Sequence, residues 1–266
     1  MDNTIRDVLA NATGEIEVIP VLDGYEPDEL VEGANYLRLP ATTYMKKRHA
    51  INQAVDMAKG EYVMALDAHC LVAKGFDEQL VKDHQPDWVQ IPRRHRLDPI
   101  AWDLQDQSDN RPPIDYEYIM WPRDNQGLHG FKWDRRTLDR WDIPIDDTMT
   151  FQGSCWFMTK DWYKKIGIME VEGFTGWGQE AEEIGFKTRL HGGRVITNKN
   201  TYYAHLHKGQ TFGRMYFMPR QQTRECNLYS YDYWVNKHKD LFIATIEQFE
   251  PVPGWPTNWR DILWTR

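Results

Sequence analysis

The chain has 266 residues, a formal net charge of −8 and an isoelectric point near 5.6, so nonspecific binding to nucleic acid, which depends on Lys and Arg neutralising phosphates, is not expected. Hydrophobic residues make up 41% of the chain and charged residues 27%, which is typical of a globular protein with a full core and excludes extended disorder. No run of 18 apolar residues and no signal-peptide pattern occurs, and we therefore expect a cytoplasmic protein without a transmembrane segment.

The first segments predict a helix followed by two short strands. Apolar residues recur at helical spacing over residues 4–12, and Gly14 ends that pattern. Residues 16–22 are mostly apolar and predict a strand that ends at Asp23, where Asp-Gly signals a loop. Residues 31–39 are compatible with another short strand.

The next helix and strand lead to the most informative residues of the chain. Residues 44–58 have a helical apolar face, and the unbroken apolar run 62–66 predicts a strand buried on both faces of a largely parallel sheet. Asp67 and His69 follow directly. Ligands of open α/β sheets bind beyond the carboxyl ends of the strands, so this carboxylate and imidazole could share a divalent cation and, through it, a diphosphate. The alternative is that Asp67 caps a turn and His69 packs.

The remaining pattern predicts alternating helices and strands around one long irregular segment. Helices are predicted over 76–83, 161–166 and 179–190, and strands over 88–91 and 194–203. The alternation of the last strand places His205 and His207 on one face. Residues 92–150 are polar and rich in Pro, Trp and Asp, and such a long irregular stretch is often functional.

We expect one catalytic domain over residues 1–208, with 92–150 as a variable segment on the acceptor side. Residues 209–266 form an aromatic-rich C-terminal extension, which we expect to pack on that domain because aromatic clusters bury large apolar areas. The three cysteines are too few and too scattered for a disulfide framework or a zinc motif, and we expect reduced, packed thiols.

Four segments, taken in order, resemble glycosyltransferase family 2 and, more closely, the polypeptide N-acetylgalactosaminyltransferases. They are Leu66-Asp67-Ala68-His69-Cys70 and residues 152–160, 174–186 and 203–208. The resemblance covers most of residues 1–208. It implies the GT-A fold, an α/β fold with a mostly parallel central sheet flanked by helices, in which an Asp-x-Asp or Asp-x-His motif holds a metal on the diphosphate of a sugar donor. The strand with which the family normally opens has no counterpart before the first helix.

The resemblance also implies a metal site. Its ligands would be Asp67, His69 and one of His205 or His207, with His205 the better match when counted from the Gly192-Gly193 pair. Imidazole suits Mn²⁺-like metals better than Mg²⁺, so we expect Mn²⁺, with Mg²⁺ as the alternative. Isolated histidines also occur as packed residues, and this reading stays open for each.

The donor site implied by the resemblance combines residues from several segments. The expected donor-binding residues are Asp23, Arg48, Asp67, Gly153, Trp177 and Glu180, and the expected catalytic residues are Asp67 and Glu180. Asp23 would contact the base or ribose, and Arg48 the phosphates. Trp177-Gly178-Gln179-Glu180 resembles the family's Trp-Gly-Gly-Glu segment beside the sugar. Glu180 would accept hydrogen bonds from sugar hydroxyls, as in a retaining enzyme, or act as the general base of an inverting one.

These features predict a metal-dependent glycosyltransferase that moves a sugar from a nucleotide-diphosphate donor, for which we expect a UDP-sugar, to an acceptor hydroxyl. One alternative is a DNA-modifying glycosyltransferase acting on hydroxymethylated pyrimidines, which the basic cluster at residues 93–96 and the many stacking aromatics keep open. Another is a non-catalytic module that binds nucleotide sugars or carbohydrate.

Overall fold

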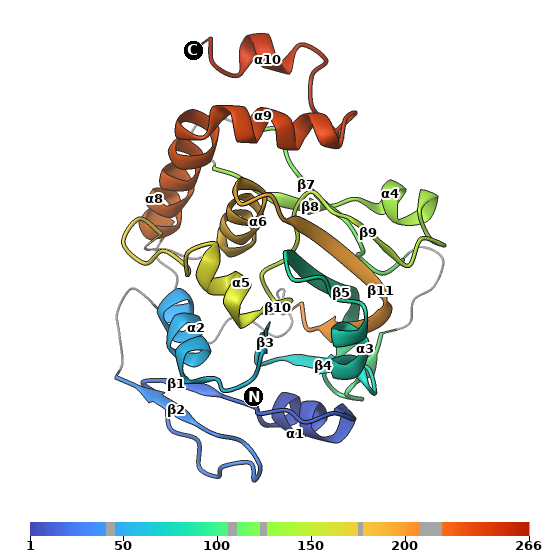
Figure 1. Ribbon diagram of the computed structural model, residues 1–266, viewed down its shortest axis with the longest axis vertical. Helices are drawn as coiled ribbons and strands as arrows, with labels where there is room; N and C mark the ends of the chain where they lie inside the picture. The colour runs from blue at the N-terminus through green and yellow to red at the C-terminus, as the bar shows by residue number, and fades with distance from the viewer. Residues whose placement is uncertain (41–45, 106–110, 123–126, 175–177, 208–219, 266) are drawn as a thin grey trace.

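The computed structural model describes residues 1–40, 46–105, 111–122, 127–174, 178–207 and 220–265 (Figure 1). Its centre is a seven-stranded mixed sheet flanked by helices, and a group of C-terminal helices covers one end. The α/β class predicted from the sequence is confirmed.

The elements of the first half are α1 (Asp2–Asn11), β1 (Val21–Asp23), β2 (Leu37–Leu39), α2 (Lys46–Met57), β3 (Tyr62–Leu66), β4 (Cys70–Val72), α3 (Phe76–Lys82), β5 (Trp88–Asp98), β6 (Asp103–Leu104), β7 (Glu117–Ile119) and β8 (Gly130–Lys132). The second half contains α4 (Asp134–Asp139), β9 (Ile145–Asp147), β10 (Cys155–Thr159), α5 (Lys160–Lys165), α6 (Glu180–Leu190), β11 (Arg194–His205), α8 (Arg220–Tyr231), the π-helix η1 (Asp232–Lys237), α9 (Lys239–Gln248) and α10 (Trp259–Ile262).

The large sheet has the strand order β3-β10-β5-β11-β4, with β6 paired to β5 and β9 paired to β11. Only β5 and β11 run parallel among its described strands, and the other pairs are antiparallel. The sheet is therefore mixed, whereas the sequence favoured a mostly parallel one. An unbroken apolar run indicates that a strand is covered on both faces, but it does not indicate whether the strand runs parallel or antiparallel to its neighbours.

The N-terminal strands form a separate two-stranded sheet. β1 and β2 pair in parallel, and a single bridge between Val18 and Ala34 precedes them. The strand expected over residues 16–22 is thus shorter and displaced toward Asp23. Among the described residues, β1 is the first strand and follows α1.

Two apolar clusters cover the two faces of the large sheet. Trp156 and Met158 of β10 face α2, α5 and α6, while Cys155 and Phe157 of the same strand face the opposite cluster, which includes Phe76 of α3. This alternation follows from the two-residue period of a strand. Both faces of the sheet are therefore covered. β3, the strand of the apolar run 62–66, lies at the edge of the sheet and contributes to both clusters, but of its residues only Val63 is buried, which is less burial than the sequence predicted.

A third cluster joins the C-terminal helices to the rest of the molecule. It contains buried residues of η1, α9 and α10 together with Phe186 of α6 and residues between Tyr116 and Met149. The predicted variable segment and the aromatic extension thus share one core, while their domain boundaries remain a prediction. Cys70, Cys155 and Cys226 are buried and form no disulfide with one another, in agreement with the packed thiols that the sequence predicted. None of the described helices is long and apolar enough to cross a lipid bilayer.

Candidate functional site

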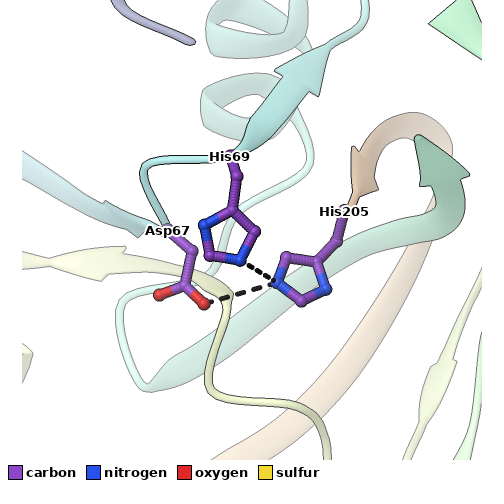
Figure 2. Close-up of side chains that lie close together, drawn as sticks. All are labelled: Asp67, His69 and His205. Carbon is purple, nitrogen blue, oxygen red and sulfur yellow. Dashed lines mark hydrogen bonds and ion pairs between the residues drawn. The ribbon is translucent and has the colours of Figure 1, made fainter. Parts of the chain in front are cut away.

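Three metal-capable side chains from two distant parts of the chain meet at the strand ends of the large sheet (Figure 2). Asp67 directly follows β3, and its backbone N–H donates to Ser154 O at 2.8 Å, which holds it beside the start of β10. His69 precedes β4, and its carbonyl accepts from Leu206 N at 3.1 Å. Residue 205 lies opposite Cys70 in the antiparallel β4–β11 ladder, so the ends of both strands bring the two histidines together.

The ligand atoms of these side chains form a small triangle. The Nε2 atoms of His69 and His205 are 3.0 Å apart, and Asp67 Oδ2 is 3.4 Å from His205 Nε2. Adjacent ligands of a six-coordinate ion with bonds of about 2.1 Å stand about 3.0 Å apart. Two imidazoles and one carboxylate on one side of an ion also suit a Mn²⁺-like metal. The residues present therefore fit one divalent cation with open positions.

Lys47 supplies a positive charge to the same cluster. Its Nζ donates to Asp67 Oδ1 at 2.9 Å and to Gly153 O at 2.8 Å. Burial alone would raise the pKa of Asp67, but the charge of Lys47 and the hydrogen bonds from His205 and Lys47 outweigh it and hold that pKa well below its usual range. Asp67 is consequently a carboxylate at any physiological pH and is ready to bind a cation.

Glu180 approaches this cluster from the start of α6. A Cβ atom built on Gly153 would lie 3.4 Å from Glu180 Cβ and 3.7 Å from Glu180 Oε2. These are ordinary van der Waals distances, and they show that the loop whose carbonyl binds Lys47 lies directly against the start of α6. The charge of Glu180 also acts on Lys47, and the structure thus brings Asp67, Gly153 and Glu180 into one site.

His207 lies beside the triangle. Its ring centroid is 5.2 Å from that of His205, and it does not belong to the group of three ligands. Burial, followed by the positive charge of Arg94, lowers the pKa of His207 to about 4. The geometry favours His205 over His207 as the third ligand.

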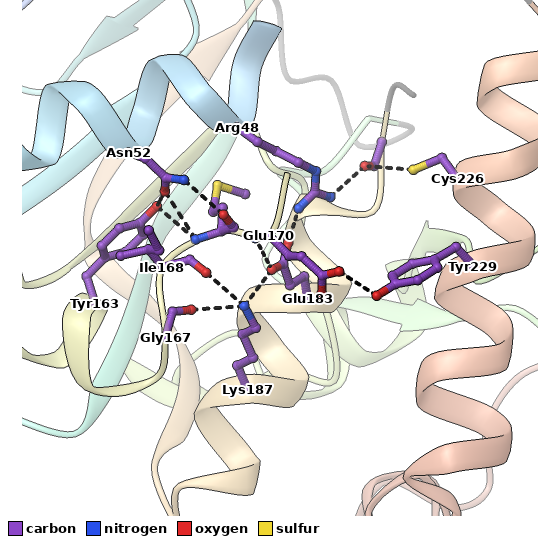
Figure 3. A network of polar contacts seen from close by, with 12 residues as sticks. Arg48, Asn52, Tyr163, Gly167, Ile168, Glu170, Glu183, Lys187, Cys226 and Tyr229 are labelled. Carbon is purple, nitrogen blue, oxygen red and sulfur yellow. Dashed lines mark hydrogen bonds and ion pairs between the residues drawn. The ribbon is translucent and has the colours of Figure 1, made fainter. Parts of the chain in front are cut away.

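A buried polar network holds the helix that carries Glu180 (Figure 3). Arg48 Nη1 is hydrogen-bonded to Glu183 Oε2, and Arg48 Nη2 donates to Gly178 O at 3.0 Å. The other oxygen of Glu183 accepts from Lys187 Nζ and from Glu170 N, both at 2.7 Å. Arg48 and Glu183 are almost fully buried, at 3% and 0% side-chain exposure. Contact between Arg48 and donor phosphates remains a prediction that requires this pair to open.

The model of Glycosyl transferase family 2 matches residues 1–167, which is well over half of the sequence. The chain belongs to glycosyltransferase family 2.

Relatives of this family 2 chain include two animal proteins. It is 22% identical over 222 residues to a putative polypeptide N-acetylgalactosaminyltransferase 13 of Drosophila melanogaster, covering 76% of this chain and 36% of the relative. It is 24% identical over 150 residues to a probable N-acetylgalactosaminyltransferase 8 of Caenorhabditis elegans, covering 54% of this chain and 33% of the relative. The chain thus spans about a third of the length of these relatives.

A solved structure shares the fold. The crystal structure of GalNAc-T7 with UDP, GalNAc and Mn²⁺ superimposes with a TM-score of 0.65 at 17% identity, covering 97% of this chain and 51% of that one. The GT-A fold expected from the motifs is thereby confirmed.

Of the other expected donor-site residues of the family 2 chain, one lies away from the triangle and one falls on residues that the structure does not describe. Asp23 is half-buried at the end of β1, in the separate two-stranded sheet. Trp177 lies outside the described residues. The sequence reasoning singled out Arg48 and gave Lys47 no role in the site. Consecutive helical residues point about 100° apart, and this spacing could have shown that Lys47 and Arg48 serve different neighbours.

Proposed function

We propose that this family 2 chain is a Mn²⁺-dependent transferase that moves a sugar from a UDP-sugar to an acceptor hydroxyl. The observation that carries the proposal is the convergence of Asp67, His69 and His205 at the end of β3. The UDP and Mn²⁺ in the GalNAc-T7 structure, which shares the fold, support the choice of donor and metal.

In this proposal Asp67, His69 and His205 hold the metal. When bound, the ion would neutralise the charge that develops on the diphosphate as the sugar–phosphate bond breaks. Lys47 lies within hydrogen-bond distance of Asp67, so its ammonium group is close enough to turn toward a phosphate oxygen. We assign phosphate compensation to Lys47 and assign to Arg48 the task of positioning α6.

The sugar would lie against Gly153 and Glu180. Gly153 has no side chain to fill the space beside Glu180, and a carboxylate there can accept hydrogen bonds from sugar hydroxyls. Asp23 and Trp177 keep their proposed contacts with the base or ribose and with the sugar. Only part of the length of the relatives is present here, so the acceptor is inferred from this chain alone.

Thermal unfolding with nucleotides tests the donor and the metal together. UDP at a hundredfold excess over its dissociation constant should stabilise the protein by about 2.7 kcal/mol when Mn²⁺ is present and by much less without it. GDP and CDP serve as matched controls. Equal stabilisation by UDP with and without Mn²⁺, or none at all, would contradict the proposal.

Release of UDP distinguishes a transferase from a binding module. Transferases commonly hydrolyse some donor without an acceptor, so a panel of UDP-sugars with Mn²⁺ should yield free UDP from one of them. A UDP-sugar that stabilises the protein but yields no UDP, even with hydroxyl acceptors supplied, would identify the chain as a non-catalytic module.

A further inference from the structure

Two arginines stand in the same row of the sheet as the histidine proposed to bind metal. In the parallel β5–β11 ladder, Arg96 lies opposite His205 and Arg94 lies opposite Tyr203. Residues paired across neighbouring strands project from the same face, and so do residues two apart along one strand. The register therefore places two guanidinium groups on the face that carries His205.

Arg94 is held inside the protein. It is 5% exposed, and its Nη2 donates to Glu117 Oε1 at 2.6 Å. Arg94 lines a cavity of about 10 Å³, which is room for about one water molecule. Glu117 neutralises much of its charge, and Arg94 therefore supports its neighbours and is too enclosed to bind a large ligand directly.

Arg96 is more open than Arg94, and no carboxylate of the described residues forms an ion pair with it. Its Nη1 donates to Pro112 O at 3.1 Å, which ties it to the segment that follows Arg111. Within the described ranges, no carboxylate lies within 4.0 Å of the guanidinium nitrogens of Arg96 or Arg111. Burial, followed by the like charges of Arg111 and Arg94, lowers the pKa of Arg96, and Asp134 opposes this only in part. Repulsion of this kind is relieved when an anion binds between the groups.

The location of these arginines separates them from the donor side of the site. The residues proposed for the donor diphosphate are Asp67, which follows β3, and Lys47, which lies in α2. Arg96 lies in β5, and Arg111 lies in the segment that follows this strand. His205 has Asp67 as one neighbour and is paired with Arg96 across the β5–β11 ladder. An anion bound by Arg96 and Arg111 would therefore approach the metal centre from a different direction than the donor.

We propose that Arg96 and Arg111, supported by Arg94, form an acceptor-side subsite for a phosphate group, so that the hydroxyl acceptor is a phosphate-bearing molecule. The proposal rests on the transferase function proposed above and names the class of its acceptor. Two sources present the same chemistry, a polynucleotide strand and a small phosphomonoester.

The experiment measures binding to the full chain loaded with Mn²⁺ and UDP, so that the donor site is already filled. The probes are a short single-stranded DNA oligonucleotide and glycerol 3-phosphate. Their neutral counterparts are a peptide nucleic acid of the same sequence and glycerol. The test variant is Arg96→Gln combined with Arg111→Gln. The matched control is Arg224→Gln combined with Arg260→Gln, which removes two charges from α8 and α10.

At least one phosphate probe should bind while its neutral counterpart does not, and the test variant should weaken that binding by about tenfold or more. If the source is a polynucleotide, the slope of log K against log salt should also become shallower by about 1.4, since each lost contact to a single strand contributes about 0.7. If only glycerol 3-phosphate binds, the source is a small phosphomonoester. The control variant should bind like the wild type.

The proposal is overturned if neither phosphate probe binds, or if the test variant binds them as tightly as the wild type. It is also overturned if that variant loses the stabilisation by UDP and Mn²⁺, because the arginines would then belong to the donor site. A wild-type protein that shows no UDP and Mn²⁺ effect contradicts the proposed function instead, which separates the two failures.

Discussion

The triangle of Asp67, His69 and His205 and the network of Arg48 and Glu183 both gather ionisable groups, but they differ in how their carboxylates are paired. In the network both oxygens of Glu183 have protein donors and the pair is closed to solvent, although Arg48 Nε is buried without a hydrogen-bond partner among the described residues. In the triangle, two imidazole nitrogens and a carboxylate oxygen point at one another. The carboxylate of Glu183 is thus paired with cationic groups of the protein, whereas the nitrogen and oxygen atoms of the triangle converge on a position that suits an added cation.

Lys47 and Arg48 are neighbours in α2, yet one carries a charge for ligand binding and the other a charge for structural support. Lys47 reaches Asp67 at the edge of the sheet, while Arg48 reaches Glu183 inside the molecule. Substitutions in the network should therefore change the free energy of unfolding, and substitutions in the triangle should change binding. The following predictions test that division.

Glu183→Gln should give the largest effect on stability. It removes the hydrogen-bonded counter-charge of the buried Arg48 guanidinium, and breaking such a pair typically costs about 3–5 kcal/mol. Urea unfolding measures the loss. Glu225→Gln, on the exposed surface of α8, should change stability by less than about 0.5 kcal/mol. A loss below 1 kcal/mol for Glu183→Gln, on the order expected of a surface pair, would show that the network is not a closed unit.

Asp67→Asn should leave the fold intact and remove metal binding. Changes to groups that merely orient metal ligands lower affinity about 10–100-fold, so loss of a carboxylate ligand should exceed about 100-fold. Titration of Mn²⁺ followed by electron paramagnetic resonance measures the affinity, and near-ultraviolet circular dichroism confirms the fold. Unchanged Mn²⁺ affinity would remove Asp67 from the ligand set.

The residues of the triangle could be predicted from the sequence. An apolar run followed by Asp67 and His69 predicted ligands at a strand end, because the rule depends on local pattern and on where strands finish. The alternation of the last strand gave both His205 and His207. The family resemblance favoured His205 when counted from the Gly192-Gly193 pair, and the pairing of β11 with β4 places His205 opposite Cys70, beside His69.

The network of Arg48 and Glu183 depends on contacts between distant residues, which no local sequence pattern predicts. Arg48 and Glu183 are 135 residues apart in the sequence, and nothing near either residue predicts the other. Strand direction was missed for a similar reason, because the apolar run over residues 62–66 gave no sign that β3 pairs antiparallel with β10. The role of Lys47 was not predicted because two adjacent basic residues on a helix look alike in the sequence, although they face different neighbours.

Glu182 belongs to neither set and predicts a pH dependence. Burial, together with the negative charges of Glu117 and Glu180, raises the pKa of Glu182 from 4.5 to about 8, although a backbone hydrogen bond and the charge of Arg48 act in the opposite direction. The folded protein then keeps a proton that the unfolded chain releases above pH 4.5, so this contribution to stability is complete below 4.5 and is lost as pH rises toward 8. The expected decline is at most about 1.4 kcal/mol per pH unit.

Urea unfolding across this pH range measures the decline, and Glu182→Gln should flatten it because an amide does not titrate. Glu225→Gln is again the matched control, and it should keep the wild-type slope. Identical slopes for the wild type and Glu182→Gln would assign the pH dependence to other groups.

Lys47→Met should give the smallest but most specific effect, a change of opposite sign in two affinities. Without nucleotide, the ammonium group of Lys47 is hydrogen-bonded to one oxygen of Asp67 and repels a bound Mn²⁺ ion. Its loss should therefore strengthen Mn²⁺ binding by several-fold. With Mn²⁺ present, the same loss should weaken UDP binding by about tenfold, because a charged partner of the diphosphate is gone. Isothermal titration measures both affinities, and Lys47→Arg should largely preserve them. If both affinities fall together, Lys47 only supports the loop at Gly153, and the division between network and site would have to be drawn elsewhere.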